Sequence, residues 1–293
     1  MDEARYIKLS VVIACFNAEK WIGDQLEALA AQQWSEPWEI IVVNNRSTDG
    51  SMAVVERYRK RVPHLRAIEA SEKQGAAYAM NVGARAARGV WLAFCDADDV
   101  VGAGWIAGMA EALAAHAFVS GPHDVTRLNR SALQRGRINS QPTGVQLYTN
   151  PPFLPHAGAG NMGIHRAVFD SVGGFDETMP ALFDTDFCWR VQLSGVPLVA
   201  APKAILHVRY RAEACALYRQ AKSYGQYNVF IYRRYRAKGM PRLDWKPGFA
   251  AWIYLVRSAS RLFAKEQRAP WLWELGWRLG RLKGCFKYRV LAP

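Results

Sequence analysis

The chain has 293 residues, of which 51% are apolar and 22% are charged. This length and composition are ordinary for a globular protein with one large core, and they exclude a largely disordered chain. The formal net charge of +13 favours partners that carry phosphate, namely nucleotides, nucleic acids or an anionic membrane face.

The five cysteines are odd in number and widely spaced, and no CxxC motif occurs. This pattern predicts reduced core residues in a cytoplasmic protein. The N-terminus, MDEARYIKLS, has no apolar segment typical of a signal peptide, and no uncharged apolar run approaches the roughly 18 residues that span a bilayer. We therefore expect a cytoplasmic location, peripheral on the inner membrane face if the basic tail binds lipid.

Apolar runs alternate with segments of helical periodicity over the first 120 residues. We predict strands at 9–15, 39–43, 65–69, 90–95 and 118–120, and helices at 21–33, 51–61, 76–87 and 104–115. Continuous apolar strands that alternate with helices predict a mostly parallel sheet covered on both faces. Ligands of such sheets bind at the carboxyl ends of the strands, where polar clusters lie at 16–19, 44–49 and 96–99.

The second half of the chain is less regular. Residues 121–156 show weak periodicity and predict a loop-rich insertion or an edge hairpin. An apolar run follows at 159–164, with helices at 166–172 and 185–194 and short strands at 198–200 and 204–208. From residue 212 onward the sequence predicts mostly helix.

Three carboxylates, Asp96, Asp98 and Asp99, directly follow a predicted buried strand. Like charges at this spacing repel one another unless they are neutralised. A hard divalent cation, Mg²⁺ or Mn²⁺, neutralises them and would also hold a diphosphate leaving group. The alternative is a solvated turn in which one Asp caps the next helix.

The segments FNAE, VVNNRSTDGS, KQGAAYAMNVGARAARG and DADD follow one another in this order, and GAGNMGIHRAVFDSVGGFDE and FDTDFCWRVQLSG come later. In this succession, over about residues 7–208, the sequence resembles the family 2 glycosyltransferases. The resemblance implies the GT-A fold, an α/β fold with a Rossmann-like, mixed but mostly parallel sheet flanked by helices. Residues 1–210 would form the catalytic domain, with the nucleotide sugar bound by about 1–120 and the acceptor by about 121–210. Residues 211–293 would form a basic, aromatic-rich helical C-terminal extension.

The resemblance implies roles for particular residues in donor binding. In the DxD motif, Asp96 would contact the ribose or sugar of the donor and Asp98 would bind the metal, with Asp99 as a helper. The implied cofactor is Mn²⁺ or Mg²⁺, with Asp96, Asp98 and His207 as ligands, although a lone His after a strand can also be merely hydrogen-bonded. The other implied donor-binding residues are Ala14, Phe16, Glu19, Asn44, Lys73, Gly75 and Ala97.

On the donor side, the sequence departs from the family pattern in two places. Asn44 and Asn45 stand where the family usually carries an acidic residue that reads the base, and an amide matches a different base edge. Met80 replaces an Arg, so no diphosphate-binding Arg can be assigned there. Asp49 has the position of a helix cap and is interpreted as structural.

On the acceptor side, the resemblance implies that Asp184 is the catalytic base, with Phe183 in place of the usual Glu. The alternative role for Asp184 is capping of the next helix. Gly160, Asn161 and Asp186 are assigned to the acceptor side, although Asp186 could instead fix the loop. The spacing of Arg190 predicts a helical ion pair with Asp186.

The implied reaction is transfer of a sugar, with inversion, from a nucleotide-diphosphate sugar to a carbohydrate or lipid-linked acceptor in cell-surface polysaccharide or glycolipid synthesis. One alternative is a sugar-phosphate nucleotidyltransferase, which needs a Gly-rich basic loop after the first strand where this chain has FNAE. The other is a non-catalytic basic protein that binds membrane or nucleic acid. Gly158–Gly163 also matches a dinucleotide-binding GxGxxG, but a Pro-rich segment precedes it rather than a strand.

The tail gathers aromatic and basic residues. On a helix, four leucines would share one face, and Trp271, Trp273 and Trp277 would lie among Arg278, Arg281 and Lys283; the leucines are Leu272, Leu275, Leu279 and Leu282. This pattern is typical of an interfacial helix on an anionic membrane. The alternative is a helix packed over the catalytic domain with a solvated basic face. We do not expect nucleic-acid binding, since no recognition motif accompanies the charge.

Overall fold

The computed structural model describes residues 6–130, 139–211, 213–264 and 267–292. Over these residues a seven-stranded sheet has the order β3-β2-β1-β4-β8-β6-β9, with β8 antiparallel to both neighbours and the other pairs parallel. The predicted mixed, mostly parallel sheet is therefore confirmed. Its strands are β1 (Leu9–Cys15), β2 (Trp38–Asn44), β3 (Leu65–Glu69), β4 (Trp91–Asp96), β6 (Phe118–Ser120), β8 (Asn161–His165) and β9 (Val199–Ala200).

Helices cover both faces of this sheet and create two hydrophobic cores. Because side chains alternate along a strand, Val12 enters one core while Val11 and Ile13 enter the other. Helices α3, α6 and α7 contribute to the first core, and α1, α2 and α4 to the second. Their bounds are α1 (Ile22–Ala30), α2 (Ser51–Arg59), α3 (Ala76–Ala86), α4 (Trp105–Ala115), α6 (Arg166–Ser171) and α7 (Phe183–Leu193).

A small sheet of β5 (Val100–Val101), β10 (Leu206–His207) and β7 (His123–Asp124) lies beside the acidic segment. It brings the residues that follow β10 next to those that follow β4. In the segment predicted to be loop-rich, the described part contains β7 and two isolated bridges, Gln146 with His156 and Thr149 with Pro152. Residues 131–138 of that segment lie outside the described residues.

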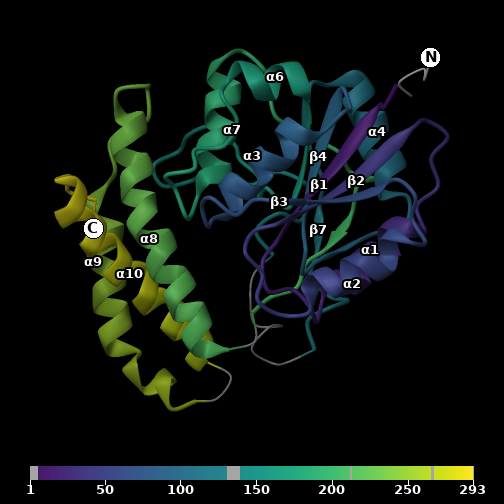
Figure 1. Cartoon of the computed structure of the whole chain (residues 1–293). Coiled ribbons are helices and arrows are strands. Elements are labelled where there is room, and N and C mark those ends of the chain that lie inside the picture. Colours follow the sequence, from purple (N-terminus) through teal and green to yellow (C-terminus); the bar gives the residue numbers. More distant parts are fainter. Residues whose placement is uncertain (1–5, 131–138, 212, 265–266, 293) are drawn as a thin grey trace.

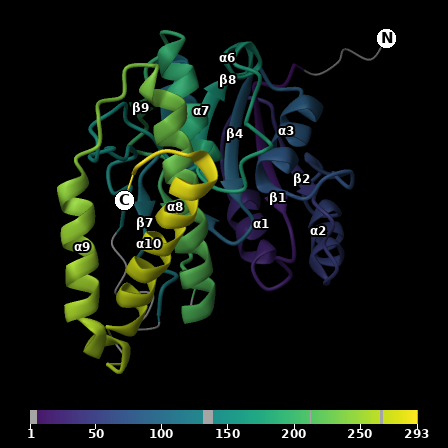
Figure 2. The same ribbon diagram turned by 90° about the vertical axis from the view of Figure 1, so that its left-hand side faces the viewer.

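The C-terminal extension is helical, as predicted, and lies to one side of the sheet domain (Figure 1). Helix α8 (Ala214–Arg236) is nearest to the domain and also joins its first core. Helices α9 (Trp245–Arg257) and α10 (Arg268–Tyr288), linked by the short η1 (Ala259–Leu262), form the outer part (Figure 2). Among the described residues we find no helix with the length and apolarity needed to cross a membrane.

The five cysteines are all free thiols. Cys15, Cys95 and Cys188 are buried, as expected of core residues. Cys215 is exposed and Cys285 is half-buried. These two lie on α8 and α10, so the prediction of a core position holds for the sheet domain and not for the extension.

Helices α8 and α10 touch backbone to backbone along a seam of glycines. A Cβ added to Gly276 would lie 2.5 Å from the carbonyl oxygen of Tyr218, and one added to Gly284 would lie 2.8 Å from that of Gln226. Gly280 abuts the carbonyl of Lys222 more closely still, and Gly225 on α8 abuts that of Trp277. Only glycine permits such an approach, since any side chain would displace the facing helix.

We expect Gly280→Ala to lower the free energy of unfolding by about 2 kcal/mol or more, because the added methyl group overlaps a backbone carbonyl. The matched control is Gly23→Ala in α1, where the new Cβ would meet Val54 at an ordinary 3.6 Å. That change should alter stability by less than about 1 kcal/mol. Urea unfolding of the two variants measures the difference, and equal effects would contradict the proposed tight seam.

Candidate active site

A cleft of about 1310 Å³ opens at the carboxyl ends of β1 and β4 and reaches the N-terminal half of α8. Parallel strands place their carboxyl ends at one edge of the sheet, which brings the polar segments together. The predicted site residues that line the cleft are Ala14, Phe16, Gly75, Asp96, Ala97, Asp98, Gly160 and Asp184. The predicted site residues that lie outside its lining are Glu19, Asn44, Lys73, Asn161, Asp186 and His207.

The acidic cluster forms as the sequence predicted. Asp96, Asp98 and Asp99 each direct a carboxylate oxygen to a point where these atoms lie within 4.8 Å of one another. Burial, with the charges of Asp98 and Asp184, raises the pKa of Asp96 to about 7. Burial and the other two carboxylates raise the pKa of Asp99 well above its usual value. Ionisation of all three carboxylates at once is therefore unfavourable without a compensating charge. Such a set of oxygen donors is suited to a hard divalent cation.

Gly160 allows the chain to pass close to this cluster. A Cβ at Gly160 would lie 2.6 Å from the Asp96 carboxylate, so any larger residue would displace the acid. Gly158 and Gly160 precede β8 and Gly163 lies within it, so the glycines lead into a strand rather than into a helix N-terminus. This context argues against a dinucleotide-binding site, which places its glycines between a strand and a helix.

Arg209 is a site residue that sequence reasoning missed. Its backbone N–H donates to Asp99 Oδ1 at 2.7 Å, and its guanidinium Nε donates to the carbonyl oxygen of Asp98 at 3.0 Å. The guanidinium also pairs with Asp24 at 3.2 Å and stacks over the Trp21 ring, 4.1 Å from its centroid. Arg209 therefore places positive charge over the acidic cluster. The run HVRYR after the last short strand carried the signal, because it places cations at a sheet edge.

Asp184 faces the cleft from the first turn of α7. Its Oδ1 accepts the backbone N–H of Thr185 at 2.8 Å, and burial raises the pKa of its carboxyl group. The alternative role as the helix cap does not apply, since the cap position is Leu182 and no side chain caps the helix. Leu182 adopts a left-handed φ of 58°, a conformation that is costly for a bulky residue and is found at functional turns.

Asn45 lines the cleft, whereas the prediction assigned its neighbour Asn44 to the donor site. Asn44 turns away from the cleft, where its amide donates to Glu69 at 2.9 Å and accepts from the Ser47 N–H at 3.0 Å. Asn45 lines the cleft instead, and its Oδ1 accepts the N–H of Gly75 at 2.7 Å. Its amide group donates to the carbonyl of Lys73 at 2.7 Å, so Asn45 also fixes the loop that lines the cleft.

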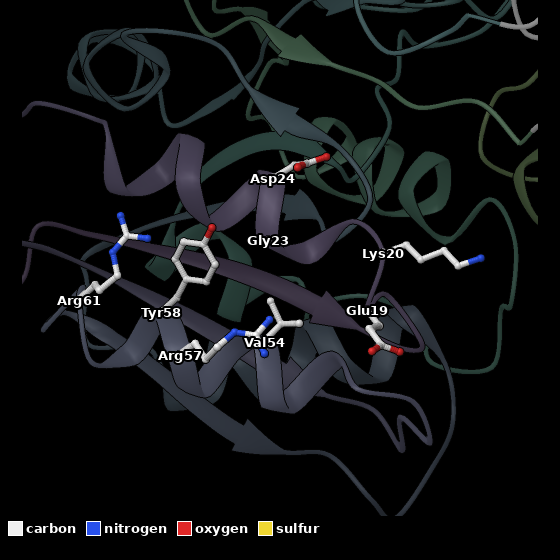
Figure 3. A pocket seen from close by; sticks show the side chains of 8 residues that line it. All are labelled: Glu19, Lys20, Gly23, Asp24, Val54, Arg57, Tyr58 and Arg61. Atoms are coloured by element: carbon white, nitrogen blue, oxygen red, sulfur yellow. The ribbon is translucent and has the colours of Figure 1, made fainter.

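Glu19 lines a different and smaller pocket of about 390 Å³, between α1 and α2 (Figure 3). Its Oε2 accepts the N–H of Gly50, while its own N–H donates to Asp49 at 3.0 Å. Asp49 also accepts the Ser51 N–H at 3.0 Å, which agrees with its predicted structural role at the start of α2. At the other end of the pocket, Arg61 is paired with Glu27 at 3.1 Å. Glu19 and Arg61 thus connect the segments of α1 and α2 at the two ends of this pocket.

Lys73, Asn161 and His207 have partners outside the cleft lining. Lys73 pairs with Glu177 at 3.1 Å, and the fully buried Asn161 accepts from the Trp105 indole N–H at 2.8 Å. His207 Nδ1 lies 2.6 Å from Asp124 Oδ2. In the described residues the cluster able to hold a metal consists of the three aspartates without His207. The donor, acceptor and metal roles predicted for these residues remain predictions that this geometry does not support.

Asp186 ties α7 to α8 rather than facing the cleft. Its fully buried carboxylate accepts from Arg190 at 2.8 Å, which is the predicted helical ion pair. It also accepts from Arg234 at 2.9 Å and from the Tyr235 hydroxyl at 2.8 Å, both on α8. These contacts support the second role considered for Asp186, which is to fix the local structure.

Further cleft residues come from segments that the sequence did not assign to the site. Gln220 and Tyr224 reach the cleft from α8, so the extension forms part of its wall. Within the part of the chain that the structure describes, Gln220 Oε1 and His123 Nε2 are buried and have no hydrogen-bond partner. Two such atoms in one cleft wall are suited to receive hydrogen bonds from a polar ligand. Burial lowers the pKa of His123 to about 4, so its ring is neutral at pH 7.

Comparisons with known proteins agree with this geometry. The family model "Glycosyl transferase family 2" matches residues 10–173. The chain is 39% identical over 94 residues to "Uncharacterized glycosyltransferase YibD" of Escherichia coli K12, which is 32% of this chain and 27% of that protein. It is 34% identical over 98 residues to "Poly(ribitol-phosphate) beta-glucosyltransferase" of Bacillus spizizenii, which is 33% of this chain and 16% of that protein. Each match therefore spans less than a third of the relative.

Among solved structures, the fold is similar to that of the mannosyltransferase PcManGT from Pyrobaculum calidifontis in complex with GDP-Man and Mn²⁺. The TM-score is 0.66 at 19% sequence identity, over 96% of this chain and 87% of that chain. At this identity the likeness concerns the fold alone, and it confirms the predicted GT-A architecture.

We expect Asp186→Ala to lower the free energy of unfolding by about 3 kcal/mol, because it removes the buried carboxylate that Arg190, Arg234 and the Tyr235 hydroxyl share as an acceptor. Denaturant unfolding measures the loss, and Asp170→Ala on the exposed side of α6 is the control. If Asp186→Ala instead kept wild-type stability and lost acceptor affinity, the structural role would be wrong and the acceptor role correct.

Proposed function

Because the chain belongs to glycosyl transferase family 2, we propose that it transfers a sugar from a nucleotide-diphosphate sugar to an acceptor hydroxyl, with inversion. The observation that carries this proposal is that Asp184 and the acidic cluster line the same cleft, close enough for the charge of Asp184 to raise the pKa of Asp96. The nucleotidyltransferase alternative needs a Gly-rich basic loop after β1, and Phe16–Glu19 provides neither glycine nor a cation. The retained carboxylates argue against a non-catalytic protein.

The donor binds, in this proposal, along the edge formed by β1, β4 and the Gly75 loop. Ala14 and Phe16 line the nucleotide end, and Phe16 is 49% exposed, which leaves its ring free to pack on a base. Asn45, which presents an amide rather than a carboxylate, stands near the same end. Arg209 and Arg211 line the cleft by the acidic cluster and can bind the diphosphate.

The metal that fits this site is Mn²⁺ or Mg²⁺, held by Asp96 and Asp98 with Asp99 beside them. The fit rests on three carboxylates within 4.8 Å of one another, an all-oxygen donor set that hard cations prefer. Bound there, such a cation would neutralise charge on the diphosphate leaving group. The complex of PcManGT with GDP-Man and Mn²⁺ supports the same combination of ligands.

Asp184 acts as the general base. Its carboxylate takes the proton of the acceptor hydroxyl while that oxygen forms a bond to the anomeric carbon, and the bond from this carbon to the diphosphate oxygen breaks. Attack on the face opposite the leaving group inverts the anomeric centre and requires no covalent intermediate. The raised pKa of Asp184 makes it a stronger base than an exposed carboxylate.

The acceptor side of the cleft lies between Asp184, the segment near His156 and Gly158, and helix α8. Gln220 Oε1 can accept a hydrogen bond from an acceptor hydroxyl group, and His123 Nε2 can accept or donate one according to its tautomer. A polyol or sugar, free or lipid-linked, provides such groups. The name of the Bacillus spizizenii relative, which acts on a ribitol-phosphate polymer, supports an acceptor in cell-surface polysaccharide or glycolipid synthesis.

A thermal-shift panel of UDP, GDP, dTDP and CDP, each with and without Mn²⁺, tests the donor site. We expect one nucleotide to raise Tm by about 5 °C at a hundred times its Kd, and only with Mn²⁺, because it binds the native state alone. Asp98→Ala should abolish the shift and Asp170→Ala should preserve it. A shift that is independent of both Mn²⁺ and Asp98 would contradict the donor-site assignment.

Asp184→Asn tests the base. We expect kcat to fall by about 10²- to 10⁴-fold, because the amide cannot take the acceptor proton. The nucleotide-dependent thermal shift should persist, since Asp184 lies on the acceptor side. Release of nucleoside diphosphate from the donor measures the rate, with Asp170→Asn as the control. A variant that retains more than a tenth of the wild-type kcat would exclude Asp184 as the base.

A further inference from the structure

The C-terminal extension carries the entire net positive charge of the chain. Residues 211–293 contain 18 Lys and Arg against 4 Asp and Glu, whereas residues 1–210 contain 20 against 21. The net electrostatic attraction to an anionic surface therefore comes from the extension, since the charges of residues 1–210 nearly cancel.

Helix α9 presents an apolar stripe to solvent. Trp245, Phe249, Ile253 and Val256 are 57%, 59%, 46% and 72% exposed, and their spacing of four, four and three residues places them on one face of the helix. Leu255, on the inward face, is buried. Apolar residues scattered singly over a surface are ordinary, but four large ones aligned on one helix indicate an interaction surface.

Helix α10, to which the sequence assigned the lipid-facing residues, uses several of them in packing against its neighbours. The indole N–H of Trp271 donates to the carbonyl of Leu255 on α9 at 3.1 Å, and the Trp273 ring packs edge-on against Tyr224 of α8 at 6.0 Å between centroids. Arg281 is buried against α8. On α10, Leu282 and Phe286 remain 36% and 84% exposed. The longer row of aligned, exposed apolar side chains belongs to α9, which lies beside α10 in the face shown in Figure 2.

We propose that α9 lies flat in the headgroup region of an anionic membrane, with this apolar stripe inserted among the acyl chains. Lys246 and Arg257 each follow a stripe residue by one position, so they lie along the adjoining strip of the helix, where lipid phosphates would meet them. Both residues are exposed. A helix of 13 residues is about 20 Å long, which suits a helix lying in the interface rather than crossing the bilayer.

Charge complementarity favours a membrane over other occupants of the stripe. A second copy of the chain would bring two strongly basic extensions together, and their like charges would repel. Single-stranded nucleic acid binds through stacking on aromatic rings, and two of the four stripe residues, Ile253 and Val256, are aliphatic. An anionic bilayer satisfies both the apolar stripe and the flanking cations.

Co-sedimentation of the full chain with phospholipid vesicles tests this inference. The vesicles consist of phosphatidylcholine alone or with a third of phosphatidylglycerol, and we expect binding to the anionic vesicles only. The double variant F249E/I253E should lower the partition coefficient by at least about tenfold, because it places two carboxylates in the inserted stripe. The matched control A250E/Y254E makes the same charge change at the same spacing, one residue further along, at two exposed positions outside the stripe.

The inference holds if the control variant binds at least three times more tightly than F249E/I253E, with both variants retaining the wild-type circular dichroism and Tm. Absence of wild-type binding to anionic vesicles would overturn it. Equal losses in the two variants would also overturn it, since they would show attraction by charge without insertion. So would a wild-type dimer in sedimentation velocity that F249E/I253E converts to a monomer, because the stripe would then be a self-association surface.

Discussion

Repulsion among three carboxylates is the constraint around which the cleft is arranged. Asp96, Asp98 and Asp99 follow β4 directly, so the buried strand fixes them close together whatever their mutual repulsion. The surroundings compensate in two ways visible here. Arg209 brings both a backbone N–H and a guanidinium to the cluster, and Gly160 leaves the space that the Asp96 carboxylate occupies. The divalent cation proposed for this site would complete the compensation.

The extension is a structural part of the site as well as an addition to the domain. Asp186 lies two residues after Asp184 and pairs with Arg234 of α8, so the helix that carries the proposed base is locked to the extension by a buried ion pair. The same α8 supplies Gln220 to the wall of the cleft, on the side proposed to bind the acceptor. A division of the chain near residue 210 therefore cuts through the candidate active site, because residues on both sides of it line the cleft.

Sequence reasoning reached the features that depend on local pattern. Continuous apolar runs predicted the central strands within one residue at most ends, and the residues directly after β1 and β4 proved to line the cleft. The sequence pattern could not predict the direction of individual side chains. Asn44 and Asn45 are adjacent, and the turn after β2 decides that Asn45 is the one that faces the cleft. Arg209 and Gln220 were missed because they reach the site by tertiary packing from more than 100 residues after Asp98.

The glycine seam between α8 and α10 links substitutions in α10 to the shape of the cleft. Gly276, Gly280 and Gly284 recur every four residues and face the backbone of α8, so the separation of the two helices is set by the absence of side chains. A substitution there would act as a wedge, shifting α8 along with its cleft-lining residues. Changes in acceptor preference can therefore arise at positions on α10 that never meet the acceptor, and a screen confined to the cleft lining would overlook them.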